Sequence, residues 1–342
     1  MRVHWATEID GVANQLGFSV HNRRAREALA AAGVELAEDA PVALHVASPV
    51  MFDPPDDGRL HVVYTAWDST RLPEAAECLA AADAVICTSS YMVPVLERAA
   101  RPGTPFFVCP LGVDAEQFAP PGGARRRLRR GERMRVLWIG APNCRKGYRH
   151  ALGAFQVMTG AGIGLEWYFK TTTYGEEKRI TRQPGSARIT FDSRRLERAE
   201  LARLYHDAHV FLFPTMGEGF GLTLAEAMAA GLPCVYTPWS GVTDYCDAGV
   251  AFPIEFTLER QRTSPNLPAD HPQYGRFCFA GEFANPDVGS ICERLCWISR
   301  NYKRAEARGR RAAARMRGYT WEHTGRKLKE ILEEITCLQA AI

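Results

Sequence analysis

Two glutamates, Glu218 and Glu226, stand eight positions apart in the segment 211–231, which reads FLFPTMGEGFGLTLAEAMAAG. Glycine occupies every second position of the turn around the first glutamate. Glycine permits positive φ and lets a ligand come close to the backbone. A helix that begins after such a turn presents unpaired N–H groups and partial positive charge. The segment therefore predicts a phosphate site with two carboxylates beside it.

Carboxylates would repel a phosphate unless they faced hydrogen-bond donors such as sugar hydroxyls. The pair of glutamates therefore favours a pocket for a nucleotide sugar. An alternative stays open for Glu226, because residues 223–226 (TLAE) fit a capping box. In that box Thr223 would accept from the backbone and Glu226 would reach back to the start of the helix.

The elements around this turn follow from local signals. The apolar run 210–213 is short enough for a buried strand and is stopped by Pro214. Good helix formers begin at Leu222, and Gly231 followed by Pro233 predicts the end of a helix of about three turns. The expected unit is a strand, a glycine loop and a helix.

The segment resembles the E-x7-E signature of the retaining GT-B glycosyltransferases of family GT4, which reads close to P-S-x-x-E-G-F-G-L-x-x-L-E-A-M-A-x-G. Thr215 replaces the usual serine. The resemblance implies that Glu226 binds the ribose of the donor and that Glu218 contacts the transferred sugar. It also implies donor contacts from the loop and the helix start, at Gly219, Phe220, Gly221, Leu222 and Thr223.

Weaker matches to the same family occur in the first half of the chain. Gly17 and His21 match its first loop, which implies contact with the donor phosphate or the acceptor. The predicted strand 42–46 has His45 near its carboxyl end, where ligands of open α/β sheets collect. Ala47 stands where the family has the second histidine of His-x-His, so a core position is an equal alternative for His45.

The segment 66–73 (AWDSTRLP) resembles the W-E-[ST]-x-x-[LI]-P segment of one branch of the family, with Asp68 as the acid. An acid at the carboxyl end of a strand, facing a cleft between domains, is placed to contact an acceptor hydroxyl. Capping of the next turn is the alternative role for Asp68.

Cations are expected to bind the donor diphosphate. Lys146 keeps the family's K-G position after the predicted strand 134–140, whereas Ala141 stands where an arginine is usual. Arg145 could supply the missing charge, and two cations between a strand and a helix suit a phosphate. A further strand, 165–170, ends on Lys170, which is also expected to contact the donor.

Strands and helices alternate in both halves of the chain, which predicts two doubly wound parallel-sheet (Rossmann-like) domains facing a cleft, the α/β architecture called GT-B. A linker at 120–133, rich in Pro, Gly and Arg, would separate an acceptor-side domain, 1–119, from a donor domain, 134–319. The terminal helix, 320–342, is expected to return to the first domain. A long loop is expected at 260–283, with 283–287 (FANPD) opening the next helices.

Composition fits a soluble globular protein of two domains, with 342 residues, 46% hydrophobic and 24% charged. The net charge of +3 is too small to indicate a nucleic-acid partner. Two basic runs, 125–130 and 303–317, fit a linker and a solvated helix face, and contact with an anionic surface is the alternative.

Compartment and metal chemistry follow from what the sequence lacks. Its ten cysteines are scattered and no apolar run reaches the length of a membrane span, so a cytoplasmic enzyme with reduced thiols is expected. His206 and His209 have helical spacing but no acidic third ligand nearby, so they are expected to be structural.

The sequence and the family resemblance together imply transfer from a nucleoside diphosphate sugar to an acceptor hydroxyl, with the retention typical of the family, without a metal and with no bound cofactor. The acceptor stays open among a glycan, a lipid-linked sugar, a small molecule and a nucleic acid. Two alternatives are a nucleotide-sugar epimerase or hydrolase on the same fold, and a nucleic-acid-binding protein that uses the arginine runs.

Overall fold

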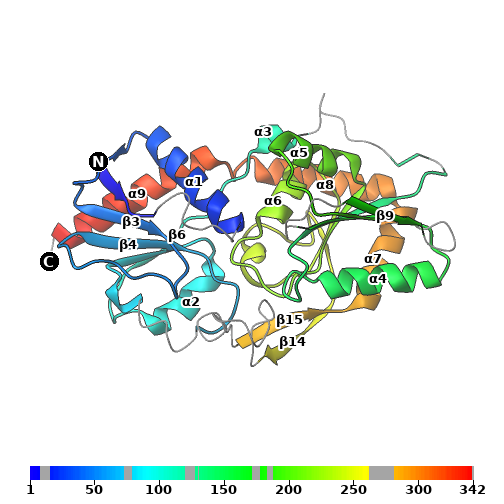
Figure 1. Ribbon diagram of the computed structural model, residues 1–342, viewed down its shortest axis with the longest axis horizontal. Coiled ribbons are helices and arrows are strands. Elements are labelled where there is room, and N and C mark those ends of the chain that lie inside the picture. The colour runs from blue at the N-terminus through cyan, green and yellow to red at the C-terminus, as the bar shows by residue number, and fades with distance from the viewer. Residues whose placement is uncertain are drawn as a thin grey trace.

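Two β-sheets, one from each half of the chain, organise the molecule along its long axis (Figure 1). The computed structural model describes residues 1–7, 16–72, 79–119, 128–129, 131–171, 178–182, 188–261 and 281–340. The two sheets with their helices confirm the predicted α/β fold of two parallel-sheet units.

The N-terminal sheet has six parallel strands in the order β2-β1-β3-β4-β5-β6. Its central strands are almost fully buried because helices or loops cover both faces. The bounds are β1 Arg2–Trp5, β2 Glu35–Leu36, β3 Val42–Val46, β4 Leu60–Thr65, β5 Ala84–Cys87 and β6 Phe106–Val108, with helices α1 Leu16–Ala31, η2 Ser90–Met92, α2 Val93–Leu96, η3 Glu97–Ala99 and α3 Ala115–Phe118.

The C-terminal sheet has the order β13-β12-β11-β7-β8-β10-β9, and β9 is antiparallel to β10. Its strands are β7 Arg135–Gly140, β8 Glu166–Thr171, β9 Lys178–Arg182, β10 Arg188–Asp192, β11 Val210–Phe213, β12 Cys234–Tyr236 and β13 Phe252–Pro253. Its helices are α4 Tyr148–Gly160, α5 Arg198–Asp207, α6 Leu222–Ala229, η6 Ser240–Asp244, α7 Val288–Arg300 and α8 Tyr302–Met316.

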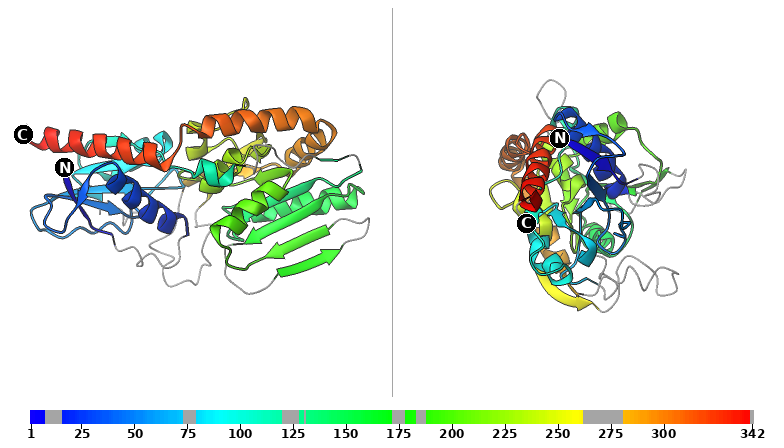
Figure 2. Two further views of the ribbon diagram at one scale, coloured as in Figure 1. Left: turned by 90° about the horizontal axis from the view of Figure 1, so that it is seen from above. Right: turned by 90° about the vertical axis from the view of Figure 1, so that its left-hand side faces the viewer.

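The last helix, α9 Trp321–Ala340, packs along α1 of the N-terminal sheet (Figure 2). A Cβ built at Gly325 would overlap the Ala28 carbonyl oxygen, so the two helix backbones are in close contact. Thr324 Oγ1 also donates to the Pro110 carbonyl oxygen at 3.0 Å. The strands of the two sheets fall on either side of the predicted linker 120–133, whose residues lie mostly outside the described part of the chain.

Three local predictions differ from the structure. Helix α1 begins at Leu16, so Gly17 lies in its first turn and not in a loop. The predicted loop 260–283 begins and ends in an antiparallel hairpin of β14 Phe256–Gln261 and β15 Gly281–Pro286. Phe283 therefore lies in a strand, and Asp287 caps helix α7 by accepting from the Ser290 N–H.

Among the described residues, no helix combines the length and apolarity that crossing a bilayer requires.

Candidate functional site

The glycine loop joins β11 to α6 as predicted, but it does not form a capping box. The N-cap of α6 is Gly221, in the left-handed region at φ 89°, with no side-chain cap. Thr223 lies inside the first turn, and the Glu226 carboxylate accepts a hydrogen bond from the Tyr205 hydroxyl at 2.8 Å. The capping alternative for Glu226 is therefore wrong, because its side chain is turned toward α5.

Four charged side chains meet at the start of the glycine loop, and we call them the ionic cluster: Asp68, Arg145, Lys146 and Glu218. Lys146 Nζ lies 2.6 Å from Glu218 Oε1. Arg145 Nη1 lies 3.0 Å from Asp68 Oδ2 and 3.5 Å from Glu218 Oε1. Only Asp68 comes from the N-terminal sheet. The cluster holds two cations and two anions, so its formal charges cancel.

Burial and neighbouring charge perturb both cations of the ionic cluster. Burial lowers the pKa of Lys146, and the positive charge of Arg145 acts in the same direction. Burial acts to lower the pKa of Arg145 as well, but the Asp68 and Glu218 carboxylates outweigh it and raise this pKa above its ordinary value. Arg145 therefore stays charged, and Lys146 is held beside a carboxylate that has only 5% of its surface exposed.

A tight turn presents the two cations. Gly147 has φ 69°, and a Cβ at this position would overlap the Pro214 carbonyl oxygen. The Lys146 N–H donates to Asn143 Oδ1 at 3.0 Å, and the Met216 N–H donates to the Arg145 carbonyl at 2.7 Å. The turn is thus fixed to the end of β11, which explains why glycine is needed beside Lys146.

The loop glycines are packed against protein, which differs from the expectation that they leave the backbone open to a ligand. The Gly219 N–H donates to Asp68 Oδ1 at 2.7 Å. A Cβ at Gly217 would overlap the Asp68 carbonyl oxygen, and one at Gly241 would overlap the Gly219 carbonyl oxygen. The alternating glycines therefore let the N-terminal sheet's Asp68 loop approach the C-terminal half closely.

Glu226 occupies a half-buried position under α5. Burial raises the pKa of its carboxyl to about 7, and the hydrogen bond from Tyr205 partly opposes that shift. The Tyr205 hydroxyl also lies 3.3 Å from the Thr223 carbonyl oxygen. Sequence reasoning missed Tyr205, although it lies on the buried face of the helix that precedes the motif.

If Glu226 binds the ribose of a nucleotide-sugar donor, as the resemblance implies, Glu226→Gln should raise the donor Kd about 10- to 100-fold, since a hydrogen bond to a charged group contributes about 1.5–3 kcal/mol. Wild-type affinity should increase as the pH rises through about 7, where the carboxyl ionises, and the variant should show a flat profile. The pKa of Glu226 is higher in the folded protein than in the unfolded chain. Its contribution to the free energy of unfolding is therefore fully present below pH 4.5 and is lost as the pH rises through about 7.

Donor titrations by calorimetry between pH 6 and 8 would measure both effects. Glu226→Ala with unchanged donor affinity would contradict the assignment and leave Glu226 only its contact with Tyr205.

Two further predicted site residues, His45 and Lys170, form their hydrogen bonds with residues outside the ionic cluster. His45 Nε2 lies 2.9 Å from His61 Nδ1, and its ring meets Phe52 edge-on at 5.1 Å. Burial lowers the pKa of His45 to about 4. Lys170 Nζ donates to the Thr171 and Asp192 carbonyls at 2.7 and 3.3 Å. Gly17 is exposed in α1.

The surroundings of three further predicted site residues are defined: Phe220 and Leu222 at the glycine loop, and His21 in α1. Phe220 is buried, and its carbonyl accepts from the Tyr245 hydroxyl at 2.9 Å. Leu222 begins α6. His21 is buried beside the Tyr64 ring, and this burial lowers its pKa to about 3. His21 is therefore a neutral core residue of α1.

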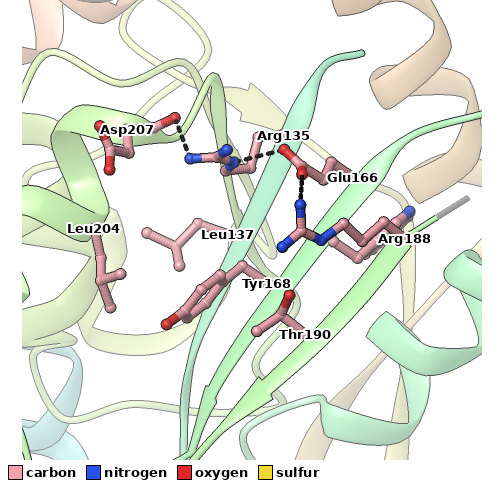
Figure 3. A pocket seen from close by; sticks show the side chains of 9 residues that line it. Arg135, Leu137, Glu166, Tyr168, Arg188, Thr190, Leu204 and Asp207 are labelled. Carbon is pink, nitrogen blue, oxygen red and sulfur yellow. Dashed lines mark hydrogen bonds and ion pairs between the residues drawn. The ribbon is translucent and has the colours of Figure 1, made fainter. Parts of the chain in front are cut away.

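A separate hollow of about 200 Å³ lies between α5 and the strands β7, β8 and β10 (Figure 3). Arg135 Nε donates to Glu166 at 2.8 Å, and Arg188 lies 3.3 Å from the same carboxylate. Arg135 also donates to the Asp207 carbonyl at 3.3 Å. None of the predicted site residues lines this hollow, and its two arginines, Arg135 and Arg188, both pair with Glu166.

The second basic run forms α8, and several of its arginines bind the chain itself. Arg308 and Arg311 donate to the Ala251 and Gly249 carbonyls at 3.2 and 2.9 Å. Arg315 pairs with Asp247 at 2.6 Å. The expected solvated face is thus partly a scaffold for the segment 245–251.

Comparison with known proteins relates the C-terminal part of the candidate site to a described family. Residues 133–259, which hold the glycine loop and the cations, match the family described as "Glycosyl transferases group 1". The chain is 32% identical over 130 residues to the MMP alpha-(1->4)-mannosyltransferase of Mycolicibacterium hassiacum, covering 37% of this chain and 30% of that protein. It is 27% identical over 179 residues to a GDP-mannose-dependent alpha-(1-6)-phosphatidylinositol dimannoside mannosyltransferase of Mycobacterium tuberculosis, covering 48% and 44%.

Solved structures extend the likeness of the fold over the whole chain, although the chain matches less than half the length of those two mannosyltransferases. The sucrose-phosphate synthase of Thermosynechococcus elongatus superimposes with a TM-score of 0.66 at 15% identity, covering 99% of this chain and all of that one. The trehalose 6-phosphate synthase of Burkholderia multivorans gives 0.60 at 14% identity, covering 95% and 77%. Residues 133–259 thus match the group 1 glycosyltransferases, and the whole chain has the two-domain GT-B fold of these solved structures.

Proposed function

We propose that this protein transfers a sugar from a nucleoside diphosphate sugar to an acceptor hydroxyl, with retention at the anomeric carbon. The observation that carries the proposal is the ionic cluster at the start of the glycine loop, where Lys146 contacts Glu218 at 2.6 Å. A diphosphate would take Lys146 and Arg145 as cationic partners and release Glu218 to accept from the hydroxyls of the transferred sugar.

In the proposed reaction the acceptor oxygen bonds to the anomeric carbon on the face from which the diphosphate leaves. The bond between that carbon and the phosphate oxygen breaks, and its electron pair goes to the diphosphate. The acceptor proton passes to the leaving phosphate oxygen on the same face. Lys146 and Arg145 stabilise the negative charge that develops there, so the proposal assigns no step to a metal or another cofactor.

The donor is proposed from the relatives. One of the two mannosyltransferases is described as GDP-mannose-dependent, which makes GDP-mannose the first donor to test. Glu226, in the second turn of α6, is proposed to hold the donor ribose because the resemblance of its segment implies that role. A cytoplasmic location belongs to the same proposal and is supported by the free thiols of all eight cysteines among the described residues.

Product stereochemistry tests the mechanism directly. An α-linked sugar donor should give an α-linked product in the anomeric proton spectrum, and turnover should persist in EDTA. A β-linked product would overturn retention, and complete loss of activity in EDTA, restored by one divalent ion, would overturn the metal-independent step. A thermal-shift screen of nucleotide sugars identifies the donor beforehand, since a bound donor raises the unfolding temperature.

A further inference from the structure

Residues 88–91 after β5, from the first half of the chain, contact residues 237–244 after β12, from the second half. Thr88 Oγ1 donates to the Gly219 carbonyl at 3.2 Å. The Ser90 N–H and hydroxyl both donate to Asp244, at 2.7 and 2.6 Å. A Cβ built at Gly241 would lie 2.7 Å from Ser89 Oγ. The two segments therefore lie face to face.

Four buried polar side-chain atoms on these segments have no hydrogen-bond partner among the described residues. They are Ser89 Oγ and Tyr91 Oη on one side, and Thr237 Oγ1 and Trp239 Nε1 on the other. The rings of Tyr91 and Trp239 meet edge to face, with centroids 5.8 Å apart. Buried polar atoms in native proteins almost always have partners, so four together indicate groups that a ligand satisfies.

These atoms adjoin the proposed reaction centre. Ser240, beside Trp239, has φ 65°, which is uncommon for a residue other than glycine. Its hydroxyl accepts from the Glu218 N–H at 2.8 Å, and the Gly241 N–H donates to the Glu218 carbonyl at 2.9 Å. The segment 237–241 is thus bonded directly to the glutamate of the ionic cluster, and its backbone strain is of the kind that functional sites hold.

We infer that Ser89, Tyr91, Thr237 and Trp239 form the acceptor subsite, and that the acceptor is a neutral, hydroxyl-rich molecule such as an unphosphorylated sugar. This inference rests on the proposed function. Hydroxyl groups of a sugar both donate and accept, which matches three hydroxyls and one indole N–H. The rings of Tyr91 and Trp239 supply apolar surface against which sugar C–H groups can pack.

Charge around the subsite argues against a phosphorylated acceptor. Burial raises the pKa of the Tyr91 hydroxyl, and the negative charges of Asp68 and Glu282 act in the same direction. Asp244 adds a third carboxylate, through its bonds to Ser90. Arg145 and Lys146 already pair with carboxylates and are assigned to the donor diphosphate. A nucleic acid or sugar phosphate would therefore meet mainly negative charge.

The variants Tyr91→Phe and Thr237→Val test whether these two hydroxyls bind a ligand or are only buried without a hydrogen-bond partner. Removing a buried hydroxyl that lacks a partner should hold or raise the unfolding temperature of the unliganded protein, by about 2 °C. The same change should raise the acceptor KM roughly tenfold, as one lost hydrogen bond would. The donor Kd should not change. Thr159→Val is the matched control, since Thr159 in α4 also has a buried hydroxyl without a partner among the described residues.

Calorimetry on the protein loaded with the nucleoside diphosphate of its donor, which carries no sugar to transfer, gives a readout that does not depend on turnover. The probes are methyl α-mannoside, methyl α-glucoside and glycerol, each against its phosphorylated counterpart. Tighter binding of a neutral probe, weakened in Tyr91→Phe and unchanged in Thr159→Val, would support the inference. Preference for a phosphorylated probe, absence of binding by every neutral probe, or equal binding by Tyr91→Phe would overturn it. Failure of every nucleotide sugar to bind would count instead against the proposed function.

Discussion

Lys146→Ala is expected to lower kcat/KM by about 10²- to 10³-fold, the loss found when one group that stabilises developing negative charge is removed. Lys146 Nζ lies 2.6 Å from Glu218 and shares the ionic cluster with Arg145, so no other lysine in the cluster can replace it. The loss should fall mainly on kcat, because charge on the diphosphate grows as the bond to the sugar breaks. Initial rates with the donor found by thermal shift would measure it.

Lys146→Arg serves as the control, because it keeps a cation at the position while changing its shape. It should retain more activity than Lys146→Ala, and both variants should unfold at similar temperatures. Equal kcat in Lys146→Ala and the wild type would refute the role of this lysine in leaving-group stabilisation. An increase in KM alone would assign it to ground-state binding of the donor.

Gly147→Ala is expected to destabilise the protein by about 3 kcal/mol or more, since the left-handed conformation costs a residue with a Cβ about 1–2 kcal/mol before any overlap is counted. Here φ is 69° and the new Cβ would overlap the Pro214 carbonyl oxygen. Relieving that overlap means moving the turn away from the end of β11. The unfolding temperature should fall by roughly 6–12 °C, since each kcal/mol shifts it by about 2–4 °C in a domain of this size.

Gly160→Ala, at the other end of helix α4, tests whether the loss of stability is specific to Gly147. Gly160 ends α4, and a Cβ there would meet nothing within 4 Å. Alanine favours helix over glycine, so this variant should be as stable as the wild type or slightly more stable. If both variants unfolded at the wild-type temperature, the close contact between Gly147 and Pro214 would be contradicted.

The elements around the E-x7-E segment could be predicted because their signals are local. An apolar run, a proline stop and a run of helix formers each act within a few residues, and β11 and α6 formed where these signals placed them. Local signals also allowed a capping box between Thr223 and Glu226, and that alternative was wrong. The partner of Glu226 is Tyr205, which lies 21 positions earlier in the chain and is brought there by packing of α5.

The contacts of the loop glycines could not be predicted from sequence for a similar reason. Asp68 and Gly219 are 151 positions apart, and their hydrogen bond depends on how the two halves of the molecule meet. The sequence indicated that Gly217 and Gly219 need close approach, but it could not tell a ligand from the backbone of Asp68. Resemblance pointed to Asp68, Lys146 and Glu218 one at a time, and Arg145 was added because the family's usual arginine is missing. The fold brings all four into one cluster.

The packing of α9 on α1 has a consequence for how the chain folds as it is made. The N-terminal sheet is complete by Val108, yet the helix that covers α1 spans Trp321–Ala340. On the ribosome, the first half must wait for more than two hundred further residues before that surface is covered, at synthesis rates of about 5–20 residues per second. During this interval the apolar face of α1 stays available to chaperones, and the C-terminal sheet can fold first.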